Sequence, residues 1–149
     1  MKNQKGFSLV ELLVVVIIIG ILAAIAIPSL LASRRTVNEA SAISSLRAIH
    51  SAEVAYYALN GNVYGDLTAL SGASLLDPTF TGGSLTKSGY TIAQSIVAGG
   101  ARYCSSANPT SGTNGTRIFG SSDAGVIYQG ATVACATGVL TVGAGTPIQ

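Results

Sequence analysis

The strongest constraint on this chain is an apolar run near its N-terminus. Residues Leu12 to Ile27 form an unbroken stretch of 16 apolar or glycine residues. With its flanks, the stretch from Phe7 to Ala32 covers 26 residues, interrupted only by Ser8, Glu11, Pro28 and Ser29. A membrane-spanning helix needs about 20 mostly apolar residues. A single domain made from a chain of 149 residues cannot cover so long an apolar helix. We therefore expect lipid or other copies of the chain to bury it.

The helical pattern continues beyond the apolar run. Residues at helical spacing predict one buried face, formed by Ile43, Leu46, His50, Val54 and Tyr57. Ile49 and Tyr56 lie at the margin of this face. The other face is more polar: Ser41, Ser44, Arg47 and Ser51. Asn60-Gly61 predicts the end of the helix, because both residues tolerate a left-handed cap. A helix from Phe7 to Leu59 would contain 53 residues and extend about 80 Å at 1.5 Å per residue.

From Gly61 onward the composition shifts to Gly, Ser, Thr and Ala, with short β-type runs. Residues Tyr90–Val97 are the best strand candidate, because their apolar residues alternate in part. Shorter strand candidates, bounded by turn residues, are 101–105, 117–119 and 125–128, with an edge strand at 139–142. Residues 62–88 are expected to form a long connection with a turn of helix near 67–70. We expect an α+β fold in which a small antiparallel sheet packs on the amphipathic half of the helix.

Charge is sparse and scattered. Only 9% of residues are charged, and the formal net charge is +2. A general nucleic-acid surface needs a denser basic stripe than this. The membrane orientation is also undecided by charge, since Lys2 and Lys5 precede the apolar run and Arg34 and Arg35 follow it.

Cys104 and Cys135 are the only cysteines. Two thiols cannot complete a structural zinc site, and the single His50 lies far away in sequence, so we expect no metal site. A disulfide is the simpler interpretation if this part of the chain reaches an oxidising compartment, and two separate buried thiols are the alternative. A disulfide would close a loop of about 32 residues, which corresponds to about 3.5–4 kcal/mol of stability in the chain-entropy model.

No enzymatic motif is present. The sequence contains no Gly-x-Ser-x-Gly elbow, phosphate-binding loop or metal-binding helix motif. Dispersed aspartates in turns, at positions 66, 77 and 123, do not form the cluster of oxygen ligands that calcium requires. We expect a protein that is not an enzyme and has no cofactor.

Glu11 is the exception inside the apolar segment. A charge near the centre of a bilayer costs about 2.5–3.5 kcal/mol on insertion scales, so an intramembrane carboxylate indicates a functional role. It lies in the run Lys5-Gly6-Phe7-Ser8-Leu9-Val10-Glu11-Leu12-Leu13, which is followed by the apolar stretch and Pro28. On these residues the chain resembles the type IV pilin family and the related pseudopilins of secretion systems. The resemblance is close over the first third of the chain.

The resemblance implies a specific processing step. A prepilin peptidase in the inner membrane would cut between Gly6 and Phe7 on the cytoplasmic side and methylate the new amine of Phe7. It also implies an extracytoplasmic, oxidising location for the rest of the chain. In this family the carboxylate at the Glu11 position pairs with the N-terminal amine of a neighbouring subunit during assembly. A wrongly staggered subunit would leave both charges unpaired, so the pair can set the register.

The implied organisation has four parts. Residues 1–6 are the leader, 7–32 the hydrophobic transmembrane and filament-core helix, 33–59 the amphipathic half of the helix, and 60–149 the globular head with its disulfide-bounded loop. Gly20 and Pro28 disfavour a helix interior, so we expect a kink or local melting there after assembly. Small residues at 20, 23, 24 and 26 would permit close helix packing.

The implied function is that of a structural subunit. It would be inserted in the inner membrane as a precursor, then polymerise through an assembly platform and ATPase-driven machinery into a cell-surface filament. Such filaments serve adhesion, twitching motility or DNA uptake. The alternatives are a type II secretion pseudopilin, a minor pilin, or a shell that binds DNA or another ligand. A paired cysteine loop resembles pilins more than major pseudopilins.

Two simpler interpretations of the N-terminus compete. A secretory signal peptide would use Lys2 and Lys5 as its basic region and Ala24-Ile25-Ala26 as its cleavage site, leaving Ile27 as the first residue. Glu11 and the length of the apolar run speak against it. A plain membrane anchor explains the apolar run but gives no reason for Glu11 or for the glycine before Phe7.

Overall fold

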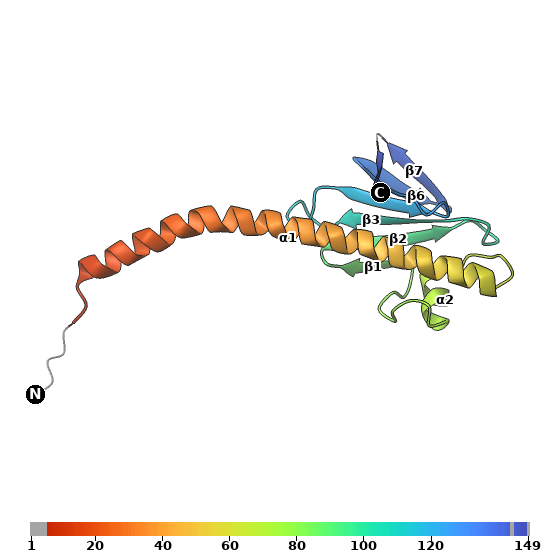
Figure 1. Ribbon diagram of the computed structural model, residues 1–149, viewed down its shortest axis with the longest axis horizontal. Coiled ribbons are helices and arrows are strands. Elements are labelled where there is room, and N and C mark those ends of the chain that lie inside the picture. The colour runs from red at the N-terminus through yellow and green to blue at the C-terminus, as the bar shows by residue number, and fades with distance from the viewer. Residues whose placement is uncertain (1–5, 144, 149) are drawn as a thin grey trace, which may run out of the picture. The chain divides into compact units, whose positions relative to one another are not determined.

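The computed structural model describes residues 6–143 and 145–148. These contain helix α1 (Leu9–Leu59), the short helix α2 (Leu67–Gly72) and eight strands (Figure 1). The strands are β1 (Ser84–Lys87), β2 (Tyr90–Ile96), β3 (Tyr103–Pro109), β4 (Ile118–Ser122), β5 (Ile127–Gly130), β6 (Thr132–Ala136), β7 (Val139–Gly143) and β8 (Thr146–Ile148). The chain forms two compact units that divide between Arg34 and Arg35. Each unit is described by itself.

The first unit is the apolar part of α1. The best 18-residue window of this helix has a mean hydropathy of 3.2, and none of that window is buried. The helix is therefore long and apolar enough to cross a membrane. It continues without a break through Gly20 and Pro28. It begins at Leu9, two residues later than the sequence predicts, and ends at Leu59 as predicted.

The second unit is built on an antiparallel sheet. Among the described strands, six form one sheet in the order β1-β2-β3-β4-β5-β8. The register pairs Tyr90 with Pro109, and Ala107 with Phe119. Because neighbouring strands in this order follow one another along the chain as far as β5, most connections are hairpins. The long helix and the antiparallel sheet confirm the expected α+β fold.

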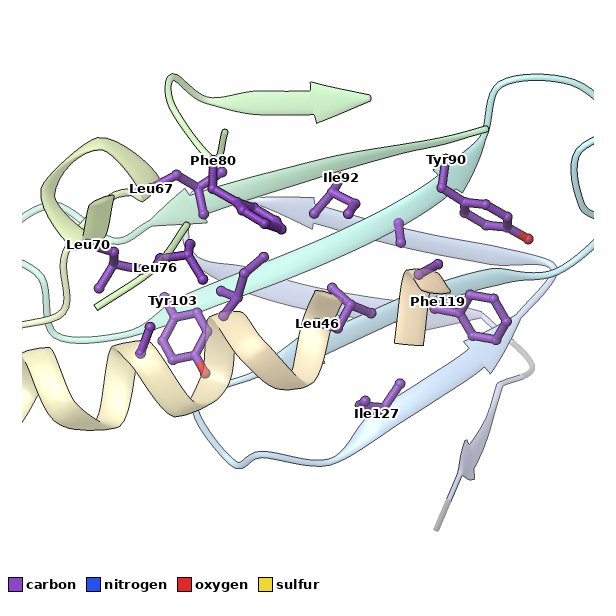
Figure 2. Close-up of a cluster of buried hydrophobic side chains, with 14 residues drawn as sticks. Leu46, Leu67, Leu70, Leu76, Phe80, Tyr90, Ile92, Tyr103, Phe119 and Ile127 are labelled. Carbon is purple, nitrogen blue, oxygen red and sulfur yellow. The ribbon is translucent and has the colours of Figure 1, made fainter. Parts of the chain in front are cut away.

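The core of this unit lies between the second half of α1 and one face of the sheet. Leu46 and Ile49 on α1 are completely buried. They belong to a cluster that includes Tyr103 on β3 and Phe119 on β4. Figure 2 shows that side chains from the segment after α1 complete one end of this cluster: Leu67, Leu70, Leu76 and Phe80.

The buried face of α1 differs from the one that the sequence predicts. Val54, predicted to be buried, is 52% exposed. Ile49, placed at the margin, is completely buried. The remaining buried positions are small or polar residues that an apolar pattern does not mark: Glu39, Ala42, Ser45, Ala52 and Glu53. Small side chains let the helix approach the sheet closely, and the two carboxylates are held by hydrogen bonds.

The opposite face of the sheet carries a hairpin. Strands β6 and β7 pair only with each other among the described residues and form a second, two-stranded sheet. Gly120 on β4 lies beneath this hairpin, since an added Cβ there would meet Val133 and Leu140. Phe119 points into the core, and successive residues of a strand point to opposite faces, so the hairpin and α1 cover opposite faces. Residues 139–142 are thus a strand, but in the hairpin rather than at the sheet edge.

A disulfide fastens the hairpin to the sheet. Cys104 on β3 and Cys135 on β6 are joined, with their Cα atoms 5.6 Å apart. At the hairpin turn, the Gly138 amide donates to the Ser95 hydroxyl of β2 at 3.1 Å. The cysteine pairing that the sequence left open is therefore a disulfide.

Strand positions were predicted unevenly. The strand expected at residues 90–97 is β2, and the helical turn expected near 67–70 is α2. The other three expected strands lie two or more residues further along the chain at one or both ends, as β3, β4 and β5. Strand β1 lies inside the expected connection, and β6 and β8 were not predicted. These three are short and contain mainly exposed residues, so they lack a clear apolar pattern.

Candidate processing and assembly segment

The N-terminal segment places Gly6 and Phe7 outside the helix. Both residues precede Leu9, where α1 begins, and the Phe7 side chain is 79% exposed. A Cβ added at Gly6 would meet no other atom within 4 Å. Both residues flanking the Gly6–Phe7 peptide bond are therefore exposed. Lys2 and Lys5 lie outside the described residues.

Glu11 has a partner within its own chain. Its Oε2 atom accepts a hydrogen bond from the Ser8 amide at 2.8 Å. In return, the Ser8 hydroxyl accepts from the Val10 amide at 3.4 Å. Ser8 immediately precedes the helix and Glu11 is its third residue, so the pair forms a capping box in which the Ser8 hydroxyl accepts from the second helical amide, Val10, in place of the third. Ser8 is thus a residue that our sequence analysis missed, although the Ser-x-x-Glu spacing marks it.

The capping box holds the carboxylate at the N-terminal end of α1. The positive end of a helix dipole stabilises an anion there. Cleavage after Gly6 would create the amine of Phe7 one residue before the Ser8 amide that Glu11 already contacts. Gly20 and Pro28 lie further along the helix, away from this end in sequence, and the helix is unbroken at both.

Two arginines of the second unit, Arg102 and Arg117, are both engaged with carboxylates. Arg102 pairs with Asp123 at 3.2 Å. The Arg117 Nε atom donates to Glu39 at 2.8 Å. Each arginine is about half exposed, yet its charge is balanced by an acid. The described surface therefore offers no free pair of guanidinium groups at these positions.

The histidine and the dispersed aspartates have structural partners. His50 Nδ1 lies 2.6 Å from the Tyr103 hydroxyl, which joins α1 to β3. Asp66 accepts from the Ala69 amide at 2.7 Å and caps α2. Asp77 accepts from the Thr79 amide at 2.8 Å. In the part of the chain that the structure describes, no three acidic, histidine or cysteine side chains gather into a metal-binding group.

A family model for the prokaryotic N-terminal methylation motif matches residues 1–27. The chain carries this methylation motif. The match contains Gly6 and Phe7, which precede α1, and Glu11 in its first turn. The resemblance to type IV pilins and pseudopilins is thereby confirmed at the motif that defines it.

Curated relatives fall into two groups. The first group contains components of type IV pili. One of them is the type IV wide pilus major component PilA4 of Thermus thermophilus, 59% identical over 39 residues, which are 26% of this chain and 30% of the relative. Another is the type IV major pilin protein PilA of Myxococcus xanthus, 41% identical over 55 residues, 37% of this chain and 25% of the relative. The second group contains the type II secretion system core protein G of Vibrio cholerae, 38% identical over 64 residues, 43% of each chain.

The likeness covers only part of each protein. For these three relatives, the match spans between 25% and 43% of the relative's length. No solved structure matches the chain. The matched stretches of 39 to 64 residues also cover less than half of this chain.

Proposed function

We propose that the chain is the structural subunit of a type IV pilus, a pilin that polymerises into a helical cell-surface filament. The observation that carries this proposal is the methylation motif at the start of an exposed apolar helix. A soluble protein does not leave such a helix uncovered. Lipid covers it in the precursor, and neighbouring helices cover it in the filament.

The proposed processing acts on the bond between Gly6 and Phe7, whose two residues are both exposed. A prepilin peptidase in the inner membrane cuts there and methylates the new amine. The leader with Lys2 and Lys5 stays on the cytoplasmic side of the inner membrane, and residues 35–148 lie on the opposite, extracytoplasmic side. The Cys104–Cys135 disulfide is consistent with that oxidising location.

The proposed assembly contact joins Glu11 to the Phe7 amine of a neighbouring subunit. A single charge in a packed apolar bundle is costly, whereas a paired one is much less so. Transfer of an apolar helix from lipid to a bundle changes little hydrophobic free energy, because both surroundings are similarly apolar. The charge pair can therefore decide the stagger between subunits. Repetition of one such contact without closure gives a filament.

Electron microscopy of sheared cell-surface filaments tests the assembly role. Filaments are expected from cells that make the native chain and are expected to be lost or severely reduced with Glu11→Ala. Glu11→Gln separates charge from size and should fail in the same way. Subunit abundance in the membrane must be equal across the strains. Normal filaments from both variants would remove Glu11 from assembly.

The N-terminal residue of the mature chain tests the processing. Mass spectrometry should find Phe7 at the N-terminus, heavier by one methyl group in place of a hydrogen. A mature chain that begins at Ile27 would instead establish a secretory signal peptide. An uncut chain that begins at Met1 would leave a plain membrane anchor.

A pseudopilin of a type II secretion system, which is the second group of relatives, or a minor pilin is the alternative. The match to core protein G of Vibrio cholerae favours it, while the disulfide-bounded loop favours a pilin. Long surface filaments made mainly of this chain would support the pilin. Loss of protein secretion on deletion, without loss of surface filaments, would support the pseudopilin.

A shell that binds DNA is a weaker alternative, because Arg102 and Arg117 are both paired with acids. Binding that is lost at high salt and on replacement of both arginines would support it. Absence of binding at low salt would exclude it.

A further inference from the structure

Glu53 is a carboxylate buried at the junction of three elements. It lies on the second half of α1, and its side chain has no exposed surface. Its Oε2 atom accepts from the Gly65 amide at 3.1 Å, and its Oε1 atom accepts from the Gln94 side-chain amide on β2. The carboxyl group therefore joins α1, the segment between α1 and α2, and the sheet.

Apart from His50, the titratable groups described around Glu53 are acids and tyrosines. On α1, His50 is bonded to the Tyr103 hydroxyl. The segment after α1 contributes Tyr64 and Asp66, and Asp66 is an acid. Strand β3 contributes Tyr103, and the turn after β4 contributes Asp123, which is paired with Arg102. Among the described residues, neither a lysine nor an arginine pairs with Glu53.

Burial therefore favours the protonated form of this group. It raises the pKa of Glu53 to about 7, from an ordinary value of 4.5. The hydrogen bonds from Gly65 and Gln94 act in the opposite direction, and the nearby Asp66 charge adds to the increase. An unpaired buried charge is costly, and protonation removes that cost.

Gln94 is suited to a protonated partner. Its Oε1 atom is buried and has no hydrogen-bond partner. A half-turn of the side-chain amide exchanges its oxygen and nitrogen, which makes the oxygen face Glu53 and gives up the longer hydrogen bond that Nε2 donates to the Gly65 carbonyl at 3.4 Å. The protonated carboxyl group can then donate to Gln94 while its other oxygen still accepts from Gly65.

Glu53 controls a segment that leads into the core. The Tyr64 amide donates to the Gly100 carbonyl at 2.9 Å. Gly65 lies against the Tyr56 ring, which leaves no room for a side chain. The next residue, Asp66, caps α2, whose Leu67 and Leu70 are completely buried. Movement of Gly65 away from Glu53 would therefore pull α2, with its buried leucines, away from the core.

We propose that Glu53 is a proton-dependent latch, which holds residues 61–66 and α2 against α1 and the sheet when it is protonated and loosens them when it ionises. The latch rests on the packing of the second unit and is independent of filament formation. Its direction follows from linkage. A carboxyl group with a higher pKa in the closed state stabilises that state at low pH, and the stabilisation is lost as pH rises from 4.5 to about 7.

Hydrogen exchange tests the latch in the full chain, held in detergent micelles. The reporters are three backbone amides. The Gly65 amide donates to the Glu53 carboxyl group, the Leu70 amide to the Asp66 carbonyl and the Ala73 amide to the Ala69 carbonyl. Glu53→Gln is permanently neutral and matches the native side chain in size. The ratio of native to variant exchange at each pH cancels the intrinsic dependence of exchange on pH. That ratio is expected to rise roughly fifty- to a hundred-fold between about pH 5 and about pH 9.

Two further measurements separate the latch from a purely structural role. Glu11→Gln makes the same chemical change in the other unit and should leave the three amides at native exchange. Carbon NMR of the native chain reports the Glu53 carboxyl group directly, even if Glu53→Gln fails to fold. A titration midpoint near 4.5, or an exchange ratio that is constant with pH, would overturn the proposal.

Discussion

Arg117 donates two hydrogen bonds from its guanidinium group to one oxygen of the buried Glu39 carboxylate. The pair joins the start of β4 to the second half of α1. Only 7% of the Glu39 side chain is exposed, whereas half of the Arg117 side chain is in solvent. The described structure contains a second arginine–carboxylate pair, Arg102–Asp123, which is more exposed on its acid side and lies at the start of β3 and the end of β4.

Arg117→Met should therefore destabilise the fold more than Arg102→Met. Removing Arg117 leaves a buried carboxylate without its partner, which is expected to lower the free energy of unfolding by about 2–4 kcal/mol. The exposed pair at Arg102 should contribute less than about 1 kcal/mol. Denaturant unfolding of the detergent-solubilised chain measures both. Equal losses for the two variants would show that burial of Glu39 does not make its pair with Arg117 more stabilising than the exposed pair.

The same pair predicts a loss of stability in acid. Burial on its own would raise the pKa of Glu39, but hydrogen bonds from Arg117 and Thr116 outweigh it and bring the pKa below 4.5. A carboxyl group with a lower pKa in the folded state stabilises the fold above its unfolded pKa. That stability is lost as pH falls below 4.5 through the folded pKa. The melting temperature of Glu39→Gln should fall less steeply with acid than that of the native chain. Parallel curves would contradict this assignment.

The disulfide should stabilise the second unit. Cys104 and Cys135 are 31 residues apart, so their bond closes a loop in the unfolded chain. In the chain-entropy model, this closure raises the free energy of unfolding by about 3–4 kcal/mol. Replacement of both cysteines with serine should lower the free energy of unfolding by about that amount. Reduction of the native chain should give a similar loss, measured by the same unfolding curves. A loss confined to the reduced native chain would point to thiol chemistry rather than to the closed loop.

Gly120→Ala should disturb the packing of the hairpin on the sheet. A Cβ at this position would lie 2.7 Å from a Leu140 methyl group and closer still to Val133. Overpacking of this kind is expected to lower the free energy of unfolding by about 1–3 kcal/mol. Gly112→Ala is the matched control, because an added Cβ there meets nothing within 4 Å. Thermal unfolding of both variants decides the point, and equal midpoints would show that the hairpin moves aside freely.

Sequence patterns predicted the parts of this chain that have strong periodicity or a specific motif. The apolar run and the helical spacing after it predicted α1, Asn60-Gly61 predicted its end at Leu59, and the alternation after Tyr90 located β2. The motif around Gly6, Phe7 and Glu11 was visible because a carboxylate is so unfavourable in an apolar segment.

Long-range pairing was beyond the sequence pattern. The burial of Glu53 depends on Gly65 and Gln94, and Gln94 lies 41 residues away. Similarly, Ser45 and Ala52 are buried because the sheet approaches the helix, and neither residue is apolar enough to reveal that. The capping box of Ser8 was a local signal that could have been found, since its spacing needs only four consecutive residues.

The two outer strands of the sheet carry one more consequence. Strand β1 has four residues and ends in Lys87, and β8 has three residues with Pro147 at its centre. Short edges with a lysine or a proline are poor templates for an additional strand. Many copies crowded side by side would therefore not stack into amyloid-like ribbons through their sheets. In the proposed filament, ordered growth would then be left to the helices.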